Sequence, residues 1–561
     1  MIGQFMIRPD HLSEKGISRL GTPTLLVLAF LLALGVMGRV ATHEFVDWDD
    51  RFLLADNPKF NPPTLHSVFG FILPRNADEN LYIPITQLMW GALAAIGHTD
   101  HPDPSGSVLN PLIFHCANLA LHLACVGVVF AILRCFVGNL PAWLGALFFA
   151  LHPVQVETVA WASGLRDLLS ALFGFIALYQ LIQYRKTSQR SRWIIATAAA
   201  ALAMLSKPSA VALPLEALAL DVLLMRTRLR QSLTSLSPWI LLAVPIVLIT
   251  RQVQPMVWPI DTPLIDRPLV ALDSIAFYIT KLVVPIHLVF DYGRTPKVAL
   301  AEGCRLIWLL PLLLAILLAW RGNRAPKLAA GALLAVAGLV PVLGLVSFQA
   351  QSYSTVSDHY LYPSMLGVAL IVACVIESAA RRSRSDMVCF VVIAILAILG
   401  SESFLLTDVW SDDSTLFSYA MSVNPRSSNA NAGFAISLAA SGDIPGAIAH
   451  YQEAEQLNPR NGMAIMGLAN LLLHEGDLDG AAAQYQRLMQ VYQMQSNFDP
   501  KLGAAGETVV ATQFIHHGDT AGAIAALEQA KQWDPANPRI DELLAHAMAT
   551  THPSSSTHAA P

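Results

Sequence analysis

Long apolar runs recur along this chain, and they constrain its fold more than any other feature. Most are long enough, or nearly so, to cross the hydrocarbon core of a bilayer, which takes about 20 residues of helix. A segment in hydrocarbon has no water to satisfy its backbone polar groups, so each crossing is expected to be helical. We predict eleven crossings, at residues 23–40, 109–134, 140–160, 166–184, 192–206, 208–225, 237–250, 306–320, 327–348, 360–379 and 387–407.

The composition excludes an ordinary soluble protein. Hydrophobic residues make up 54% of the chain and charged residues only 13%, which is typical of a polytopic membrane protein. The net charge of −5 is spread along the sequence without a basic stripe, so nothing indicates a nucleic-acid partner. The six cysteines have no CxxC spacing and lie in or beside apolar runs, and we interpret them as small core side chains.

The positive charges orient the chain. Lys and Arg gather in short clusters between the apolar runs, and cytoplasmic loops are enriched in both residues. This pattern places the N terminus in the cytoplasm and everything after about Ser411 outside. A full crossing at 269–290 would move Arg321 and Lys327 to the wrong side, so that stretch is predicted to be re-entrant or interfacial. The shorter stretch 82–96 is predicted to be interfacial or half-inserted.

Tetratricopeptide repeats follow the last apolar run. Gly442-Asp443 and Gly476-Asp477 begin similar stretches 34 residues apart, and Gly518-Asp519 begins a third after an insertion. This period, with Gly at the turn and Ala at packing positions, predicts stacked helix pairs whose concave face is suited to a peptide. We therefore predict a membrane domain at 1–410, a repeat domain at 411–549 and a disordered tail at 550–561.

Three carboxylates lie within four residues just beyond the first predicted crossing, at Asp47, Asp49 and Asp50, with Trp48 among them. Carboxylates are costly beside hydrocarbon, so this cluster is a candidate functional site, although a solvated acidic loop is the simpler interpretation. Two adjacent carboxylates are suited to act as a general base toward a hydroxyl group or to hold a divalent metal ion. The sequence shows no complete set of metal ligands.

Other polar clusters fall on the same predicted outer side, each at the end of a predicted helix. Lys207 and Arg166 would supply fixed positive charge to a lipid-linked phosphate. Structural interpretations compete: Arg and Lys often anchor helix ends, His152 can cap a helix, Glu157 can pair with Arg166, and Tyr residues form interfacial belts. Gathering on one side favours a functional site. The clusters are His152 with Gln155 and Glu157, Arg166 with Asp167, Lys207 in Ser-Lys-Pro, and Asp358 with His359, Tyr360 and Tyr362.

The motifs, taken in order, resemble those of a known family. They are DWDDRFLLADNP after the first helix, then YIPIT, HPVQVETVAWASGLRDLLSALF, LSKPSAVALPLEALALD, FDYGRTP and SDHYLYPS, followed by the repeats. Over about 20–549 this combination resembles the transmembrane and tetratricopeptide-repeat-containing O-mannosyltransferases and their bacterial relatives. The resemblance implies an all-α membrane bundle of the C-type glycosyltransferase fold, which uses a sugar linked to a polyprenyl phosphate outside the cytoplasm.

The resemblance also implies roles for individual residues. In this family the acidic pair of the first outer loop is catalytic, and here it falls on Asp49 and Asp50. The implied donor-phosphate contacts are Arg166, Lys207 and His359, and the implied supporting residues are His152, Glu157, Asp358 and Tyr360.

Three positions depart from the family pattern. Gln155 stands where a second His is common, Leu165 stands where an Arg follows the Gly, and His359 replaces an Arg. Arg166, one position further along, is suited to replace the displaced Arg. His359 would be a cation only conditionally, because the pKa of an unperturbed His is about 6.5. These departures concern the donor phosphate more than the acidic pair.

The expected reaction is a direct displacement at the anomeric carbon of mannose or another hexose. Asp49 or Asp50 would take the proton of a protein hydroxyl while the lipid phosphate leaves, and the repeats would hold the acceptor. No cofactor is certain, and a divalent metal is compatible. We expect a bacterial inner membrane with the repeats in the periplasm. The alternatives are a non-catalytic envelope scaffold and a polyprenyl-lipid transporter, although midplane polar residues and internal symmetry are not evident.

Overall fold

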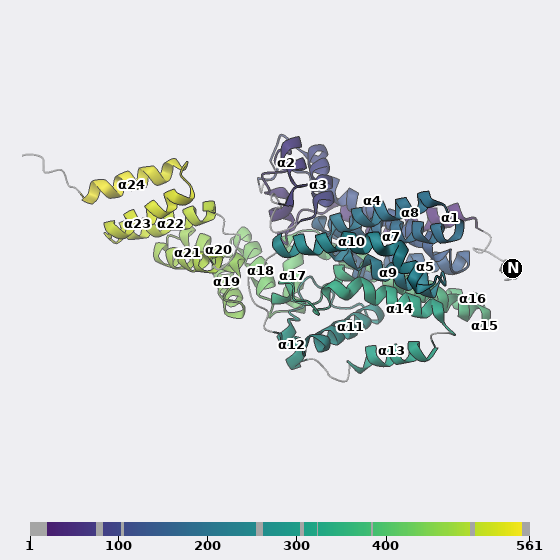
Figure 1. Cartoon of the computed structure of the whole chain (residues 1–561). Helices are drawn as coiled ribbons and strands as arrows, with labels where there is room; N and C mark the ends of the chain where they lie inside the picture. Colours follow the sequence, from purple (N-terminus) through teal and green to yellow (C-terminus); the bar gives the residue numbers. More distant parts are fainter. Residues whose placement is uncertain are drawn as a thin grey trace, which may run out of the picture.

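The chain is almost wholly helical in the part that the computed structural model describes, which comprises residues 20–74, 82–102, 106–253, 262–302, 308–321, 324–382, 385–493 and 500–551. In these ranges the only extended pairings are two isolated bridges. A bundle of helices forms one end of the molecule, and the last seven helices form an arm that projects from the other end (Figure 1). Residues 552–561 of the predicted tail and Cys304 lie outside the described residues.

The bundle follows the predicted apolar runs. Its helices are α1 (Thr22–Met37), α2 (Leu65–Gly70), α3 (Pro84–Gly97), α4 (Pro111–Leu133), α5 (Asn139–Leu151), α6 (Val156–Ala160), α7 (Leu165–Thr187), α8 (Arg190–Ser206), α9 (Leu213–Leu223), α10 (Leu229–Val253), α11 (Arg267–Val283), α12 (Pro296–Glu302), α13 (Leu309–Arg321), α14 (Pro326–Leu339), α15 (Met365–Arg382) and α16 (Ser385–Thr407).

Five helical stretches of the described residues are long and apolar enough to cross a membrane. They are Thr22–Thr42, Pro111–Leu133, Ala162–Thr187, Leu229–Val253 and Asp386–Trp410. The other predicted crossings contain shorter helices, and several end early. For example, α5 stops at Leu151, before the motif that begins with His152 and Pro153. The expected helical membrane architecture is confirmed, and the number of eleven crossings stays a prediction.

The two doubtful stretches are also helical. The stretch 82–96 contains α3, and 269–290 contains α11 followed by a loop. One side of α11 buries apolar side chains together with Asp273 and Ser274. At the last residue of the helix and just after it, Val283, Val284 and Ile286 are exposed. Such one-sided burial suits an interfacial helix, and the relation of α11 to a bilayer stays a prediction.

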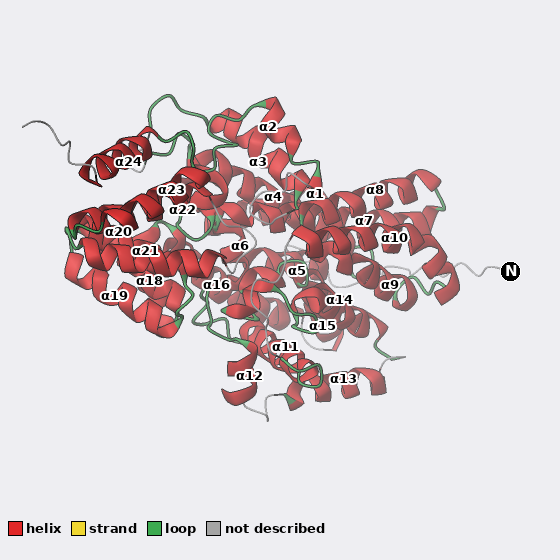
Figure 2. Ribbon diagram, turned by 60° about the vertical axis from the view of Figure 1, so that its left-hand side comes forward, coloured by secondary structure: helices red, strands yellow, loops and turns green. Residues whose placement is uncertain are grey.

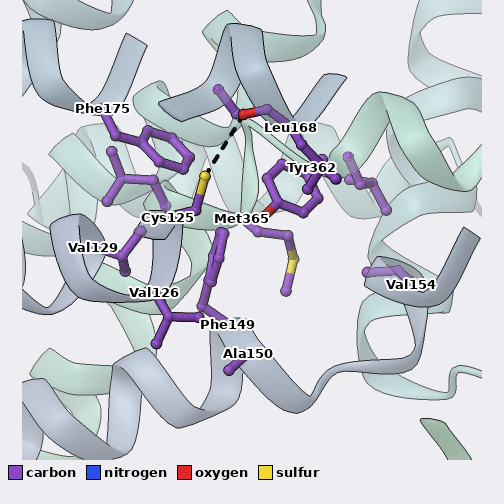
Figure 3. Close-up of a cluster of buried hydrophobic side chains, with 14 of the residues drawn as sticks. Cys125, Val126, Val129, Phe149, Ala150, Val154, Leu168, Phe175, Tyr362 and Met365 are labelled. Carbon is purple, nitrogen blue, oxygen red and sulfur yellow. Dashed lines mark hydrogen bonds between the residues drawn. The ribbon is translucent and has the colours of Figure 1, made fainter. Parts of the chain in front are cut away.

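The core of the bundle forms where α4, α5, α7 and the start of α15 meet (Figure 3). Cys125 is fully buried there, and its thiol donates to the main-chain oxygen of Leu168 at 3.7 Å. His122 contacts the Tyr362 hydroxyl at 2.8 Å and the Ala150 oxygen at 3.2 Å, so its polar atoms are satisfied inside the apolar core. Cys125 is one of five described cysteines, all of them free. Cys125 and Cys374 are buried as expected for core side chains, whereas Cys135 and Cys389 are partly buried and Cys116 is exposed.

The arm is the expected solenoid of helix pairs (Figure 2). Gly442, Gly476 and Gly518 end helices with φ of +87°, +83° and +76°, a conformation that glycine adopts without steric cost. The aspartate after each glycine accepts a hydrogen bond from a main-chain N–H three residues on and so caps the next helix. The helices of the arm are α18 (Ser428–Ser441), α19 (Ile444–Leu457), α20 (Gly462–His474), α21 (Leu478–Gln493), α22 (Pro500–His516), α23 (Thr520–Trp533) and α24 (Pro538–Thr551), and α17 (Asp413–Val423) precedes them.

Candidate active site

The acidic loop, residues 43–50, lies between α1 and the π-helical turn Arg51–Ala55. Its two adjacent aspartates, Asp49 and Asp50, have different surroundings. Asp50 is fully buried; its Oδ1 accepts from the Ser163 N–H at 2.8 Å and its Oδ2 from the Val46 N–H at 3.3 Å. Asp49 has a φ of +70°, which is uncommon for a residue with a side chain. The side chain of Asp49 is 47% exposed. The Asp49 carboxylate is therefore accessible at the surface, whereas the Asp50 carboxylate hydrogen-bonds to the main chain and fixes the position of the loop.

Burial also changes the acidity of the inner aspartate. Loss of solvation raises the pKa of Asp50, and the hydrogen bonds from Ser163 and Val46 oppose this rise. The net result is a pKa of about 7. Both main-chain donors would lose a buried acceptor if this side chain were removed. Asp50 is accordingly placed to fix the loop against the turn at Ser163.

Arg166 lies opposite the exposed carboxylate, in the first turn of α7. Its Nη2 is 3.5 Å from Asp49 Oδ2, and its Nε is 3.8 Å from Asp167 Oδ2. The guanidinium stacks on Trp161, with 4.7 Å between its carbon and the ring centroid. The indole N–H of Trp161 donates to the main-chain oxygen of Trp48 at 2.7 Å. Trp161 thus supports both the arginine and the acidic loop.

Lys207 extends this charged group from the end of α8. Its ammonium forms an ion pair with Asp167, whose side chain is only 3% exposed, and lies 5.6 Å from the ring centroid of Tyr360. Asp167 therefore faces two cations and holds them on the side where Asp49 lies. The cluster therefore contains two cations of the types that bind phosphate, the buried Asp167 and the exposed carboxylate of Asp49.

The pairing of Glu157 with Arg166, which was the structural alternative for these residues, is not present among the described ion pairs. Glu157 Oε1 instead lies 2.5 Å from His359 Nδ1, and the Ser357 hydroxyl lies 2.9 Å from both atoms. Burial and the nearby charges of Lys207 and Arg166 lower the pKa of His359. The imidazole is therefore not a fixed cation, and it lies in close contact with the Glu157 carboxyl group.

Asp358 and Tyr360 flank this histidine in the 3₁₀ turn Asp358–Leu361. Tyr292 donates to Asp358 Oδ1 at 2.8 Å, and burial raises the pKa of Asp358 to about 7. The Tyr360 ring lies 4.4 Å from the His359 ring. The turn therefore forms one wall of the charged cluster, with Tyr360 between His359 and Lys207.

His152 faces a different direction. Its Nε2 lies 3.2 Å from the Leu282 oxygen, its Nδ1 accepts from the Val154 N–H at 3.3 Å, and its ring packs on Phe148. Gln155, at the position where the family often has His, donates to the Phe149 oxygen at 3.1 Å. Both side chains hold the chain where it leaves α5, and neither meets Arg166 or Lys207 in these contacts.

Two stretches of the chain match known families. Residues 112–254 match the family described as dolichyl-phosphate-mannose-protein mannosyltransferase, and residues 433–490 match the tetratricopeptide repeat. Protein O-mannosyl-transferase TMTC3 of Mus musculus is 28% identical over 157 residues, which are 27% of this chain and 16% of the relative. Protein O-mannosyl-transferase TMTC1 of Homo sapiens is 27% identical over 180 residues, which are 30% of this chain and 19% of the relative.

Part of the chain is similar to the protein O-mannosyl-transferases. The matched stretch spans less than a fifth of the length of these two relatives. Among solved structures, ArnT from Cupriavidus metallidurans bound to undecaprenyl phosphate corresponds to 91% of this chain and 81% of its own, with a TM-score of 0.36 and 14% identity. The matched mannosyltransferase and repeat segments agree with the expected architecture of a glycosyltransferase bundle followed by repeats.

The segment that matches the mannosyltransferase family runs from α4 to α10 and contains Glu157, Arg166 and Lys207 of the cluster. The acidic loop and the turn at His359 come from outside it. A cavity of about 30 Å³ lies beside Lys207 and Asp167, between α7, α9 and α14. Gly174, Leu213 and Glu216 also line it. This volume has room for about one water molecule.

Sequence reasoning missed two residues that shape this candidate site. Trp161 and Ser163 fall inside the motif that follows His152, yet only the fold shows that they contact Trp48 and Asp50. Their signal in the sequence is the run Trp-Ala-Ser-Gly, which ends two positions before Arg166. Among the residues described, no group of three or more His, Cys, Asp or Glu side chains is arranged to hold a metal ion.

Proposed function

We propose that this chain is a membrane glycosyltransferase that moves mannose or another hexose from a polyprenyl-phosphate carrier to a hydroxyl group of a protein, on the non-cytoplasmic face. The observation that carries the proposal is the exposed carboxylate of Asp49 facing Arg166, with Lys207 held nearby by Asp167. This arrangement puts a proton acceptor beside a site for an anionic leaving group. The relatives named as protein O-mannosyl-transferases support a sugar transfer to protein.

The proposed reaction is one displacement. Asp49 takes the proton of the acceptor hydroxyl, and the acceptor oxygen forms a bond to the anomeric carbon. The bond from that carbon to the phosphate oxygen breaks, and the bonding electrons leave with the lipid phosphate. Arg166 and Lys207 stabilise the negative charge on the phosphate, with Arg166 suited to contact two oxygens at once.

The other candidate residues take supporting parts in this proposal. Asp50 holds the acidic loop, and the pair of Glu157 and His359 holds the wall that carries Tyr360. The solenoid raises the local concentration of the acceptor protein near Asp49. The end from which the solenoid projects would face the periplasm of a bacterial inner membrane, and the described N-terminal end of α1 lies away from it (Figure 1).

Transfer assays in membranes test this function. Membranes containing the full chain are supplied with radiolabelled polyprenyl-phosphate mannose, or the corresponding glucose donor, and labelled protein is counted. We expect Asp49→Asn to lower labelling by at least about 100-fold, the usual size of a general-base contribution. Asp56→Asn is the matched control, because Asp56 is an exposed carboxylate of the same segment that pairs only with Arg51 at 3.7 Å in the described ion pairs. Full labelling with Asp49→Asn would exclude the proposed base, and an absence of labelling with the wild type would favour the non-catalytic scaffold.

A further inference from the structure

The loop between α11 and α12 carries the FDYGRTP motif, which the proposed mechanism does not use. Phe290, Asp291 and Tyr292 are consecutive in this loop, and each contacts a different part of the protein. Phe290 and Asp291 are each only 2% exposed. The helices α12 and α17 lie at the end of the bundle from which the solenoid projects (Figure 1).

Asp291 connects the loop to the repeat domain. Its Oδ2 accepts from the Ser427 hydroxyl at 2.7 Å and from the Asn429 side-chain amide at 3.2 Å. Its main-chain oxygen accepts from the Asn424 side chain at 3.1 Å. Ser427 is itself the N-cap of α18 and accepts from the Ala430 N–H. The buried carboxylate therefore lies at the N terminus of α18, where the helix dipole favours a negative charge.

The neighbours of Asp291 reach both sides of the candidate active site. The Phe290 ring packs against Trp48, the residue before Asp49, with 4.3 Å between centroids. The Tyr292 hydroxyl donates to Asp358, the residue before His359. Three consecutive loop residues thus touch the acidic loop, the solenoid and the wall of the charged cluster.

The loop itself is fixed to the membrane domain. Arg294 forms two hydrogen bonds of 2.6 Å with the carboxylate of Asp273 on α11. The main-chain oxygen of Arg294 accepts from the Thr355 N–H at 2.9 Å. Gly293 has a φ of +61°, and a β-carbon there would lie 3.0 Å from the Asn424 amide nitrogen. The close approach of the loop to the solenoid therefore depends on a glycine next to Asp291.

We propose that Asp291 is a positioning residue that sets the angle of the repeat solenoid relative to Asp49. An acceptor protein bound along the solenoid is then presented to the base in one orientation. A solenoid free to swing would spread the same acceptor over a larger volume and lower its effective concentration at the site. That the solenoid presents an acceptor to Asp49 rests on the proposed function. That Asp291 fixes the angle of the solenoid does not depend on that function.

Distance measurements test the fixed angle without any assay of activity. Spin labels are introduced through non-natural amino acids at two exposed residues, His66 on α2 and Glu453 on α19, in the full chain. We expect one narrow distance distribution in the wild type and a broadened distribution in Asp291→Asn. Ser427→Ala, which removes the partner on the solenoid, should broaden it too. An unchanged narrow distribution in both variants would overturn the proposal.

Two further measurements separate positioning from a general loss of structure. Asp266→Asn, at the start of α11, is the matched control and should keep the narrow distribution. Asp291→Asn and Ser427→Ala should not have additive effects, because Asp291→Asn weakens and Ser427→Ala removes the hydrogen bond between the same two side chains. Additive broadening would mean that the two residues act separately, which contradicts the proposal.

The assay of sugar transfer tests the consequence for the acceptor. With radiolabelled polyprenyl-phosphate mannose, we expect Asp291→Asn to lower labelling of membrane proteins roughly tenfold while the KM for the lipid donor stays unchanged. Normal labelling with a broadened distance distribution would overturn the presentation of the acceptor. If the wild type transfers no sugar, the proposed function fails, and the distance distributions still decide whether Asp291 fixes the solenoid.

Discussion

Asp49 and Asp50 are adjacent in sequence and have opposite surroundings in the structure. The side chain of Asp49 is 47% exposed and lies 3.5 Å from Arg166, whereas Asp50 is fully buried and accepts two main-chain hydrogen bonds. Asp49, the exposed member of the pair, also has a positive φ. A proton acceptor must reach its substrate, so the geometry favours Asp49 as the base and gives Asp50 a supporting part.

The first prediction compares asparagine at the two positions. Asp49→Asn should lower transfer by at least about 100-fold, because the amide cannot take the acceptor proton. Asp50→Asn should keep more than a tenth of the wild-type rate, because its oxygen can still accept from the Ser163 N–H. The initial rate of sugar transfer, normalised to protein in the membrane, measures both. Equal losses for the two variants would mean that the carboxylates act as a pair.

The second prediction concerns stability and pH. The pKa of Asp50 is raised by burial to about 7 in the folded protein from 3.8. The folded state therefore favours the protonated carboxyl, and this contribution is complete below about pH 4 and is lost as the pH rises through 7. The loss is at most about 4 kcal/mol. We expect the thermal midpoint of the wild type to fall between pH 5 and pH 8.

Asp50→Asn provides the control for this pH dependence. Asparagine resembles the protonated carboxyl and does not ionise, so the variant should show a smaller fall in the midpoint over the same range. Asp358 and Asp413 also have raised pKa values, of about 7 and about 6, and both contribute in the two proteins alike. The difference between wild type and variant therefore isolates Asp50. An identical fall in both would contradict the prediction.

The parts of the fold that were predictable are those set by local sequence. Apolar length predicted membrane helices, and the Gly-Asp pairs predicted the repeat turns, because a left-handed glycine and an aspartate cap act within one turn of helix. Contacts between distant residues were not predictable. Asp50 and Ser163 are 113 positions apart, and Glu157 and His359 are 202 apart. A periodic pattern in the sequence does not predict which distant residue a buried polar side chain will contact.

The same distinction explains the residues that the resemblance singled out. It gathered Asp49, Arg166 and Lys207 by motif order, and the structure places them in one charged cluster. It also treated His359 as a conditional cation. Only the fold shows that Glu157 contacts that imidazole while burial and two neighbouring cations lower its pKa.

The third prediction separates the structural and the chemical parts of Lys207. Lys207→Met leaves the buried Asp167 without its ammonium partner, and breaking a buried ion pair from one side costs about 3–5 kcal/mol. Adding Asp167→Asn removes the unpaired charge, so the double variant should recover much of the thermal midpoint. It should not recover sugar transfer, because the phosphate still lacks its cation. Recovery of both properties would show that Lys207 has only a structural part.

The fourth prediction concerns Gly164, which immediately precedes α7. It follows Ser163 and lies two positions before Arg166. A β-carbon at this position would collide with the main-chain oxygen of Thr158. Gly164→Ala should therefore push the turn apart and destabilise the protein by about 1–3 kcal/mol. The displaced turn also moves the Ser163 N–H away from Asp50, so transfer should fall even in protein that remains folded. Gly38→Ala is the matched control, since a β-carbon there meets no atom within 4 Å. Thermal midpoints and transfer rates of the two variants decide the outcome, and a normal rate with Gly164→Ala would show that the turn does not hold the acidic loop.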